Sequence, residues 1–234
     1  MSNYVIAGGS SGVGKSLVSS LLSKGNRVWV LARSRKDLPV KEDLNFIEYD
    51  FSLSAEEIKG LPDTIHGLAY CPGSIVLSPF NRIKPQQFIN DFQINLIGAV
   101  NLIQAALPAL KNVGNSSVVL FSTVAVKTGM PFHASIASAK GAVEGLTRSL
   151  AAEYASSSVR FNAIAPSLTN TPLAERLLNT PEKQQSSAAR HPMGRFGEAD
   201  DVAAAAEFLL GPESSWITGQ ILGVDGGMGS LKTL

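Results

Sequence analysis

The stretch Tyr4–Gly14, which reads YVIAGGSSGVG, decides the fold. A short apolar run leads directly into a glycine-rich turn, and an amphipathic segment follows. Glycines allow a tight turn and a close approach of the backbone to a ligand, and the amino end of the next helix favours anions. The order predicts a phosphate-binding turn, although glycines also occur in ordinary turns. Expected contacts come from Gly8, Ser10, Ser11, Gly12, Val13 and Gly14.

Short apolar runs alternate with longer amphipathic segments along the rest of the chain. This alternation is typical of β-α-β units, in which parallel strands are buried on both faces and are therefore continuously apolar. The sequence predicts an α/β fold with a mainly parallel sheet. Seven strands are expected, at Tyr4–Ala7, Arg27–Ala32, Asn45–Tyr49, Ile65–Tyr70, Ser117–Phe121, Val159–Ile164 and Gln220–Val224.

Helices are expected between most of these strands, but two connections differ. Between Arg33 and Asn45 only about eleven residues remain, fewer than a crossover helix usually needs, so a turn or a single helical turn is expected. The polar segment Thr171–Arg190 contains two prolines and follows a strand, which favours a mobile lid. The strongest helix predictions are Val13–Ser23, Pro85–Leu110, Ala137–Tyr154 and Ala199–Leu210.

Composition restricts the classes of partner. The 234 residues are 44% hydrophobic, carry a formal net charge of +1 and can form one domain spanning residues 1–234. Basic residues are scattered, so no nucleic-acid or membrane partner is predicted and a small molecule is favoured. A single cysteine, Cys71, with no leader and no apolar run near about 18 residues, fits a cytoplasmic location.

The end of the second predicted strand bears on the choice of dinucleotide. An acidic residue at this place accepts hydrogen bonds from the adenosine ribose in proteins that bind NAD(H). Here Arg33 and Ser34 follow the strand, and a guanidinium suits the additional phosphate of NADP(H). NADP(H) is therefore preferred over NAD(H), with a solvated surface arginine as the alternative. Asp50 and Phe51, after the third strand, offer an acceptor and an apolar surface to adenine.

Several motifs carry a resemblance to short-chain dehydrogenases/reductases. The glycine spacing of the first turn resembles theirs, with Ala7 where threonine is usual. Asn95 resembles the helix asparagine of the family, and the segment 160–167, RFNAIAPS, resembles the strand and loop beside the nicotinamide. The segments 192–197, PMGRFG, and 216–220, WITGQ, resemble the ketoacyl-carrier-protein-reductase branch. Departures are Cys71-Pro72-Gly73 for the usual Asn-Ala-Gly, and Ser167 for the usual glycine.

The resemblance implies a Rossmann-type fold, a doubly wound parallel sheet of seven strands with helices on both faces. It also implies nicotinamide contacts from Pro166, Thr169 and Thr171 after the sixth strand. A homotetramer or a homodimer is favoured on the same ground. The segments Thr128–His133 and Thr171–Arg190 are expected to shape the substrate pocket, and neither carries the signature of a particular substrate.

The catalytic residues implied by the resemblance are incomplete. The family uses a tyrosine and a lysine four residues apart, with a serine thirteen residues before the tyrosine. Lys140 matches the lysine that binds the nicotinamide ribose, and Asn95 matches the residue that holds a water. Thr123 replaces the serine that orients the substrate. Ile136 occupies the tyrosine position, on the same helix face as Lys140, and has no proton to give.

Other groups can be considered as the proton donor. His133 lies beside the start of this helix, and imidazole, with a reference pKa of about 6.5, suits proton transfer near neutrality. A histidine in such a place is more often solvated or a cap. Ser135 and Ser138 are weaker candidates, since Ser138 should face away from the site. A water held by Thr123 and Asn95 is equally possible.

The sequence thus predicts an NADP(H)-dependent oxidoreductase that interconverts a small-molecule carbonyl and an alcohol. The alternative is a catalytically silent dinucleotide-binding protein that acts as a sensor or scaffold. No metal is predicted, because the histidines, the cysteine and the carboxylates lack metal-ligand spacing. A serine hydrolase is disfavoured by the absence of a Gly-x-Ser-x-Gly motif.

Overall fold

Seven parallel strands form the central sheet of the computed structural model, which describes residues 1–53 and 57–232. Their spatial order is β3-β2-β1-β4-β5-β6-β9, so the direction of winding reverses between β1 and β4. Ligands of doubly wound sheets bind at the carboxyl ends of strands beside such a reversal. The predicted fold class is confirmed. The strands are β1 (Asn3–Ala7), β2 (Arg27–Ala32), β3 (Leu44–Glu48), β4 (Gly67–Tyr70), β5 (Ser116–Phe121), β6 (Val159–Pro166) and β9 (Ile221–Val224).

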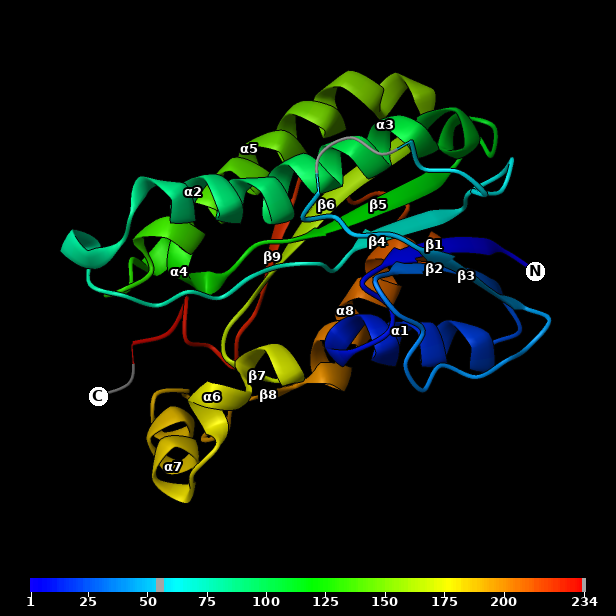
Figure 1. The fold of residues 1–234 in the computed structure, drawn as a ribbon. Helices are drawn as coiled ribbons and strands as arrows, with labels where there is room; N and C mark the ends of the chain where they lie inside the picture. The colour runs from blue at the N-terminus through cyan, green and yellow to red at the C-terminus, as the bar shows by residue number, and fades with distance from the viewer. Residues whose placement is uncertain (54–56, 233–234) are drawn as a thin grey trace.

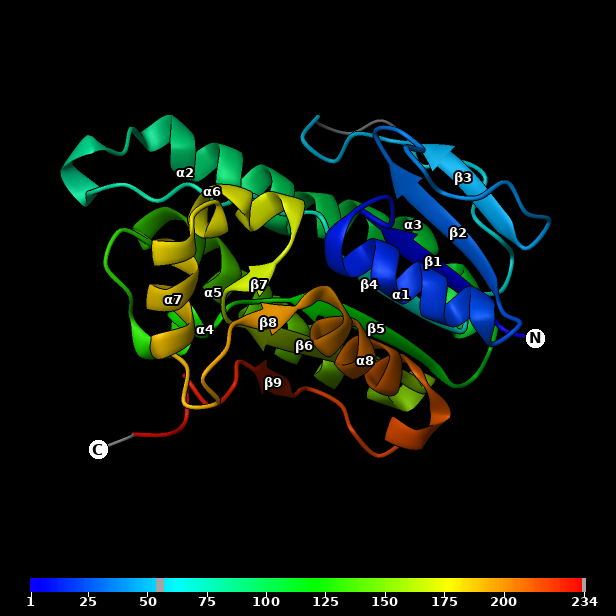
Figure 2. The same cartoon turned by 90° about the horizontal axis from the view of Figure 1, so that it is seen from below.

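Helices cover both faces of this sheet (Figure 1). On one face lie α1 (Gly12–Ser23) and α8 (Ala199–Leu210), seen in front of the strands in Figure 2. On the other face lie α3 (Gly98–Lys111) and α5 (Ala134–Tyr154). Two apolar clusters result, one on each side of the strands. Fully buried members include Leu17, Leu21 and Leu209 on the first side, and Leu102, Leu110 and Phe161 on the second.

The predicted helix Pro85–Leu110 is present but is not uniform. It consists of α2 (Pro85–Phe92), a π-helical turn η2 (Gln93–Ile97) and α3. The side-chain amide of buried Asn95, in this wider turn, donates to the backbone oxygen of Asp91 in α2 at 2.8 Å. A side chain that competes for backbone carbonyls explains a local departure from α-helical bonding. Apolar periodicity does not reveal such a turn.

The helical run Pro85–Lys111 is long and apolar enough, by length and composition alone, to cross a membrane. This differs from the expectation that no apolar stretch approaches the spanning length. Its buried residues, among them Ala99, Leu102 and Ala106, pack in the core on one face of the sheet. Core packing therefore accounts for the apolar residues of α3, whereas the buried residues of α2 and η2 are the polar Asp91 and Asn95.

The short connection between β2 and β3 contains no helix, as predicted. Two short strands, β7 (Thr169–Asn170) and β8 (Gly197–Glu198), pair in parallel. They were not predicted, because two residues are too few to show a periodic pattern. The segment between them contains η4 (Pro172–Ala174), α6 (Glu175–Leu178) and α7 (Pro181–Ala189), which project from the end of the sheet in Figure 1. Residues Thr171–Arg190 are called the lid segment below; its mobility stays a prediction. The remaining helices are η1 (Phe80–Arg82), α4 (Val124–Thr128), η3 (Ala155–Ser157) and η5 (Pro212–Ser214).

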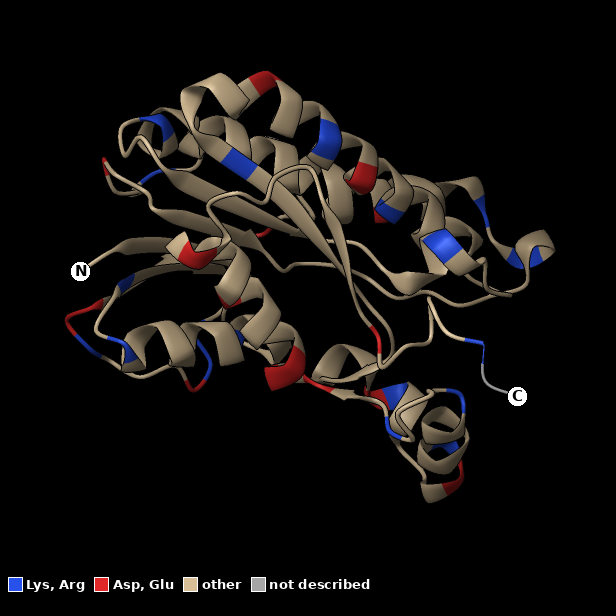
Figure 3. Ribbon diagram, turned by 180° about the vertical axis from the view of Figure 1, so that it is seen from behind, with Lys and Arg blue, Asp and Glu red and all other residues tan. Residues whose placement is uncertain are grey.

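Lys and Arg residues and Asp and Glu residues are interspersed along the helices on both faces of the sheet (Figure 3). Several of them form ion pairs at the surface, such as Arg195 with Asp201 and Lys24 with Glu207. This distribution agrees with the net charge of +1. The expectation that neither nucleic acid nor a membrane is a partner stays a prediction.

Candidate active site

The glycine turn lies at the carboxyl end of β1, beside the reversal of winding. Gly8 has a φ of +71°, and a Cβ there would lie 3.1 Å from the backbone nitrogen of Pro72, which follows β4. A Cβ on Gly14 would lie only 2.5 Å from the carbonyl oxygen of Gly8. Ser11, the N-cap of α1, makes no side-chain capping bond, so the amino-terminal N–H groups of the helix can still bind an anion. The turn therefore has the close packing and the free donors that a phosphate site needs.

The residues expected near adenosine are divided between surface and core. Arg33 and Ser34 are exposed after β2. Asp50 accepts hydrogen bonds from the hydroxyl and the backbone nitrogen of Ser52, at 2.7 and 2.9 Å, and the hydroxyl bond lowers the pKa of Asp50, with a further contribution from the charge of Arg33. Phe51 is only 4% exposed, and its ring packs among aromatic residues of the core. Arg33 is thus accessible to a ligand, whereas little of the Phe51 ring is.

A cavity of about 620 Å³ opens between the lid segment and the carboxyl ends of the central strands. It brings together residues that are far apart in the sequence, from the glycine turn, from β5, from α5 and from the loop after β6. The location is where doubly wound folds bind their ligands. The predicted site residues that line it are Val13, Thr123, His133, Ile136, Lys140, Pro166, Thr169 and Thr171.

Helix α5 supplies two of these side chains. Ile136 and Lys140 lie one turn apart, are buried, and line the cavity together, as their spacing predicts. Thr123 caps α4 at the end of β5, where its hydroxyl accepts from the backbone nitrogen of Ala125 at 3.3 Å. His133 precedes α5 and forms a hydrogen bond of 2.7 Å through Nδ1 with the carbonyl oxygen of Pro131.

Lys140 is a buried cation. Burial lowers its pKa to about 8, and the opposing influences of Cys71 and Asp91 are smaller. Its ammonium makes no hydrogen bond to any residue that the structure describes. A Cβ on Gly73 would lie 3.6 Å from Nζ and 3.0 Å from Oδ1 of Asn95, so both polar atoms closely approach this glycine. The ammonium is therefore free to bind a ligand hydroxyl.

Asn95 lies behind the cavity rather than on its wall. Its amide nitrogen donates to the hydroxyl of Ser74 at 3.0 Å, while its buried Oδ1 has no partner within the described residues. The carboxylate of Asp91, fully buried, accepts from Ser74 and Ser135 at 2.5 and 2.6 Å. The hydroxyl of Ser135 is thus engaged, and Ser138 is exposed, as predicted. A buried oxygen without a protein partner can accept a hydrogen bond from a water. That Asn95 holds a water stays a prediction.

Sequence reasoning missed a polar pair on the cavity wall. The hydroxyl of Ser167 lies 2.8 Å from Nε2 of His191, and the opposite ring nitrogen, Nδ1, lies 2.7 Å from the carbonyl oxygen of Ser187. In the sequence, Ser167 was noted only because it replaces the usual glycine of the family, and no catalytic role was predicted for it. His191 gave no signal, because its approach to Ser167 depends on the path of the lid segment.

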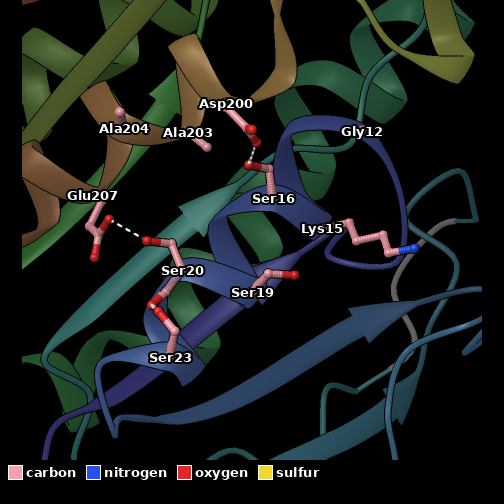
Figure 4. A pocket seen from close by; sticks show the side chains of 10 residues that line it. All are labelled: Gly12, Lys15, Ser16, Ser19, Ser20, Ser23, Asp200, Ala203, Ala204 and Glu207. Carbon is pink, nitrogen blue, oxygen red and sulfur yellow. Dashed lines mark hydrogen bonds between the residues drawn. The ribbon is translucent and has the colours of Figure 1, made fainter.

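A second cavity, of about 630 Å³, lies between α1 and α8 (Figure 4). The hydroxyl of Ser16 bonds to Asp200, and that of Ser20 donates to Glu207 at 2.7 Å. Lys15 lies at the edge of this groove, where it pairs with Asp37. Two carboxylates on its wall make the groove unsuited to an anionic dinucleotide.

A glycine turn at the reversal of a parallel sheet, with a cavity containing a buried lysine beside it, defines an α/β dinucleotide-binding protein. The family model described as "Enoyl-(Acyl carrier protein) reductase" matches residues 7–229. The chain belongs to the short-chain dehydrogenase/reductase family.

Similar proteins include oxidoreductases of this family. A tropinone reductase homolog of Arabidopsis thaliana is 34% identical over 97% of this chain and 92% of its own length. Carbonyl reductase family member 4 of Danio rerio is 33% identical over 96% of each chain. Among solved structures, ElxO with NADP bound has a TM-score of 0.87, with 24% identity over 98% of this chain and 99% of its own. At this level of sequence identity, the similarity to ElxO shows a shared fold only.

Proposed function

We propose that this protein is an NADP(H)-dependent oxidoreductase that interconverts a carbonyl and an alcohol of a small molecule. One observation carries the proposal: Lys140 and Thr123 line the same cavity as Val13 of the glycine turn. A dinucleotide held at the turn would extend into this cavity beside both side chains. The names of the carbonyl and tropinone reductase relatives support the reaction class.

Different residues of the site bind the dinucleotide and orient the substrate. The turn Gly8–Gly14 offers backbone donors to the phosphates, and its close packing matches that role. The ammonium of Lys140 binds the nicotinamide ribose, and the hydroxyl of Thr123 orients the substrate oxygen. Oδ1 of Asn95 holds a water near Lys140. The bound nicotinamide supplies or accepts the hydride.

The proposed preference for NADP(H) rests on Arg33. Arg33 is exposed at the end of β2, and its positive charge helps to lower the pKa of Asp50, which lies just after β3. A guanidinium in this place offers paired donors to a phosphate. Asp50 then accepts a hydrogen bond from the adenosine portion, and Ser34 adds a hydroxyl to the same edge. We also propose a homodimer or homotetramer in the cytoplasm.

The centre is atypical because Ile136 stands at the tyrosine position of the family pattern. A buried isoleucine cannot donate the proton that a carbonyl oxygen needs on reduction. This observation favours a second candidate, a catalytically silent dinucleotide-binding protein that senses the cofactor or acts as a scaffold. General acid catalysis is worth about 10²–10⁴ in rate, so its loss would slow the reaction without removing hydride transfer.

A binding titration and a turnover assay test both candidates. NADPH and NADH binding is followed by fluorescence, and NADPH oxidation by absorbance over a panel of ketones and aldehydes. Gly14→Val serves as the binding control, since its side chain would collide with the Gly8 carbonyl. Turnover in the unmodified protein supports the oxidoreductase, and tight NADPH binding without turnover supports the silent protein. Failure of both dinucleotides to bind would contradict both candidates.

A further inference from the structure

The pair formed by Ser167 and His191 has a defined hydrogen-bond direction. A backbone carbonyl can only accept, so the contact of 2.7 Å between Nδ1 of His191 and the oxygen of Ser187 places a hydrogen on Nδ1. In the neutral ring Nε2 is then the acceptor. The hydroxyl of Ser167, 2.8 Å away, donates to it. The imidazole is thus held at both nitrogens.

The surroundings enclose this pair and place it at the cavity. His191 is only 4% exposed, and both residues line the cavity that contains Thr123 and Lys140. A Cβ on Gly226 would lie 3.7 Å from the His191 ring, so the turn after β9 packs against it. Ser167 directly follows the last residue of β6. A fixed imidazole behind a cavity-lining hydroxyl is an arrangement that transfers protons.

We propose that Ser167 delivers the proton to the substrate oxygen during carbonyl reduction and that His191 resupplies it. This inference rests on the proposed function. Ile136 carries no proton, and the Thr123 hydroxyl, which accepts from the backbone nitrogen of Ala125, makes no hydrogen bond to a histidine within the described residues, whereas Ser167 does. Ser167 is then a catalytic residue, and His191 is a positioning residue that acts through it.

The step balances with the reduced nicotinamide as hydride source. The carbonyl carbon receives the hydride, and the electron pair of the C=O bond moves to the oxygen. That oxygen takes the proton of Ser167, whose O–H bond is remade with the proton on Nε2 of the imidazolium form of His191. The ring ends neutral and takes up one proton from the solvent after the product has left, so each carbonyl reduced consumes one solvent proton. In alcohol oxidation the neutral ring accepts the proton through Ser167, which is the hydrogen-bond direction described above.

Kinetics of three variants test the proposal. Ser167→Ala should lower kcat for carbonyl reduction by about 10²-fold or more without changing NADPH binding, because the hydroxyl proton is lost. His191→Ala should lose a similar factor, and added imidazole should restore turnover by acting as the proton source. The solvent deuterium isotope effect on kcat should change in both variants. Ser186→Ala is the control, because Ser186 lines the same cavity outside the pair.

A second measurement is independent of turnover. A small fluorophosphonate reacts with a serine hydroxyl that a histidine activates, and peptide mass spectrometry locates the adduct. Ser167 should be labelled in the protein without cofactor. The label should be lost in His191→Gln, which keeps a hydrogen-bonding side chain and removes the base.

The outcomes separate the two proposals. Unchanged reduction by Ser167→Ala overturns the proton-donor role even if the protein is a reductase. A labelled Ser167 in a protein that reduces no carbonyl overturns the proposed function and assigns the pair to acyl-transfer chemistry instead. An unlabelled Ser167, with His191→Ala insensitive to imidazole, overturns the pair itself.

Discussion

Replacing Lys140 with methionine should make the folded protein more stable while weakening its binding of NADPH. The ammonium is buried, and within the described residues it makes no hydrogen bond that the substitution would remove. Methionine keeps an unbranched apolar stem of similar length, so the volume inside the cavity wall is largely retained. The gain in stability would come from removing a desolvated charge.

The magnitude follows from the pKa of Lys140, which burial lowers from 10.5 to about 8. Between these values the unfolded chain binds the proton more tightly than the folded chain, so the free energy of unfolding rises with pH. The penalty is fully present below pH 8 and is lost above pH 10.5. At about 1.36 kcal/mol for each pH unit it amounts to about 3 kcal/mol, and we expect a gain of about 1–3 kcal/mol at pH 7.

Urea unfolding at pH 7, 8 and 9 without cofactor measures this gain. The difference between Lys140→Met and the unmodified protein should fall by about 1 kcal/mol from pH 7 to pH 9. Comparing two proteins removes most of the influence of Cys71 and Tyr70, whose pKa values burial raises and which act in the opposite direction at alkaline pH. Lys127→Met, at an exposed site on α4, is the control and should change stability by less than about 0.5 kcal/mol.

The reasoning would be refuted if Lys140→Met were no more stable than the unmodified protein at pH 7 and the difference did not vary with pH. The ammonium would then be fully compensated in the folded state. Undiminished NADPH binding by the same variant would separately contradict the assignment of Lys140 to the nicotinamide ribose.

Three further predictions concern the cofactor, the reaction and the turn. Arg33→Ala should weaken NADPH binding by about 1.5–3 kcal/mol in a titration and leave NADH nearly unchanged; equal losses would contradict the phosphate contact. Ile136→Tyr, once shown to fold normally, should raise the rate of carbonyl reduction by up to about 10²-fold, with His133→Ala as the control; no gain on several carbonyls would show that a missing phenol is not limiting. Gly14→Ala should cost more than about 1 kcal/mol in unfolding and abolish dinucleotide binding, since its Cβ would approach the Gly8 oxygen to 2.5 Å; normal binding would refute this.

Most of the fold could be predicted from the sequence, because strands buried on both faces are continuously apolar and helices keep a regular period. Helix α8 has the predicted ends, and α1 begins one residue earlier than predicted. Helix α5 begins three residues earlier than predicted, at Ala134. The π-helical turn around Asn95 depends on a hydrogen bond between a side chain and the backbone, which a hydrophobic pattern does not encode.

The sequence predicted the arrangement of the candidate site where two of its residues lie on the same helix. Ile136 and Lys140 line the cavity together because helical geometry places residues four apart on one face. His191 was missed because it meets Ser167 only through the path of the lid segment, 24 residues along the chain. The packing of Phe51 into the core also depends on tertiary contacts with Tyr70.

The pairing of β7 with β8 has a consequence for how substrate range can change within this architecture. Thr169 pairs with Gly197 and Asn170 with Glu198, so the strands that precede and follow the lid segment in the chain are paired outside the main sheet. Insertions or deletions between these anchors leave the register of the seven strands untouched, and lengthening a loop costs little entropy. The segment therefore behaves as an exchangeable module: a graft from a relative could reshape the cavity roof, provided that a residue equivalent to His191 is retained behind Ser167.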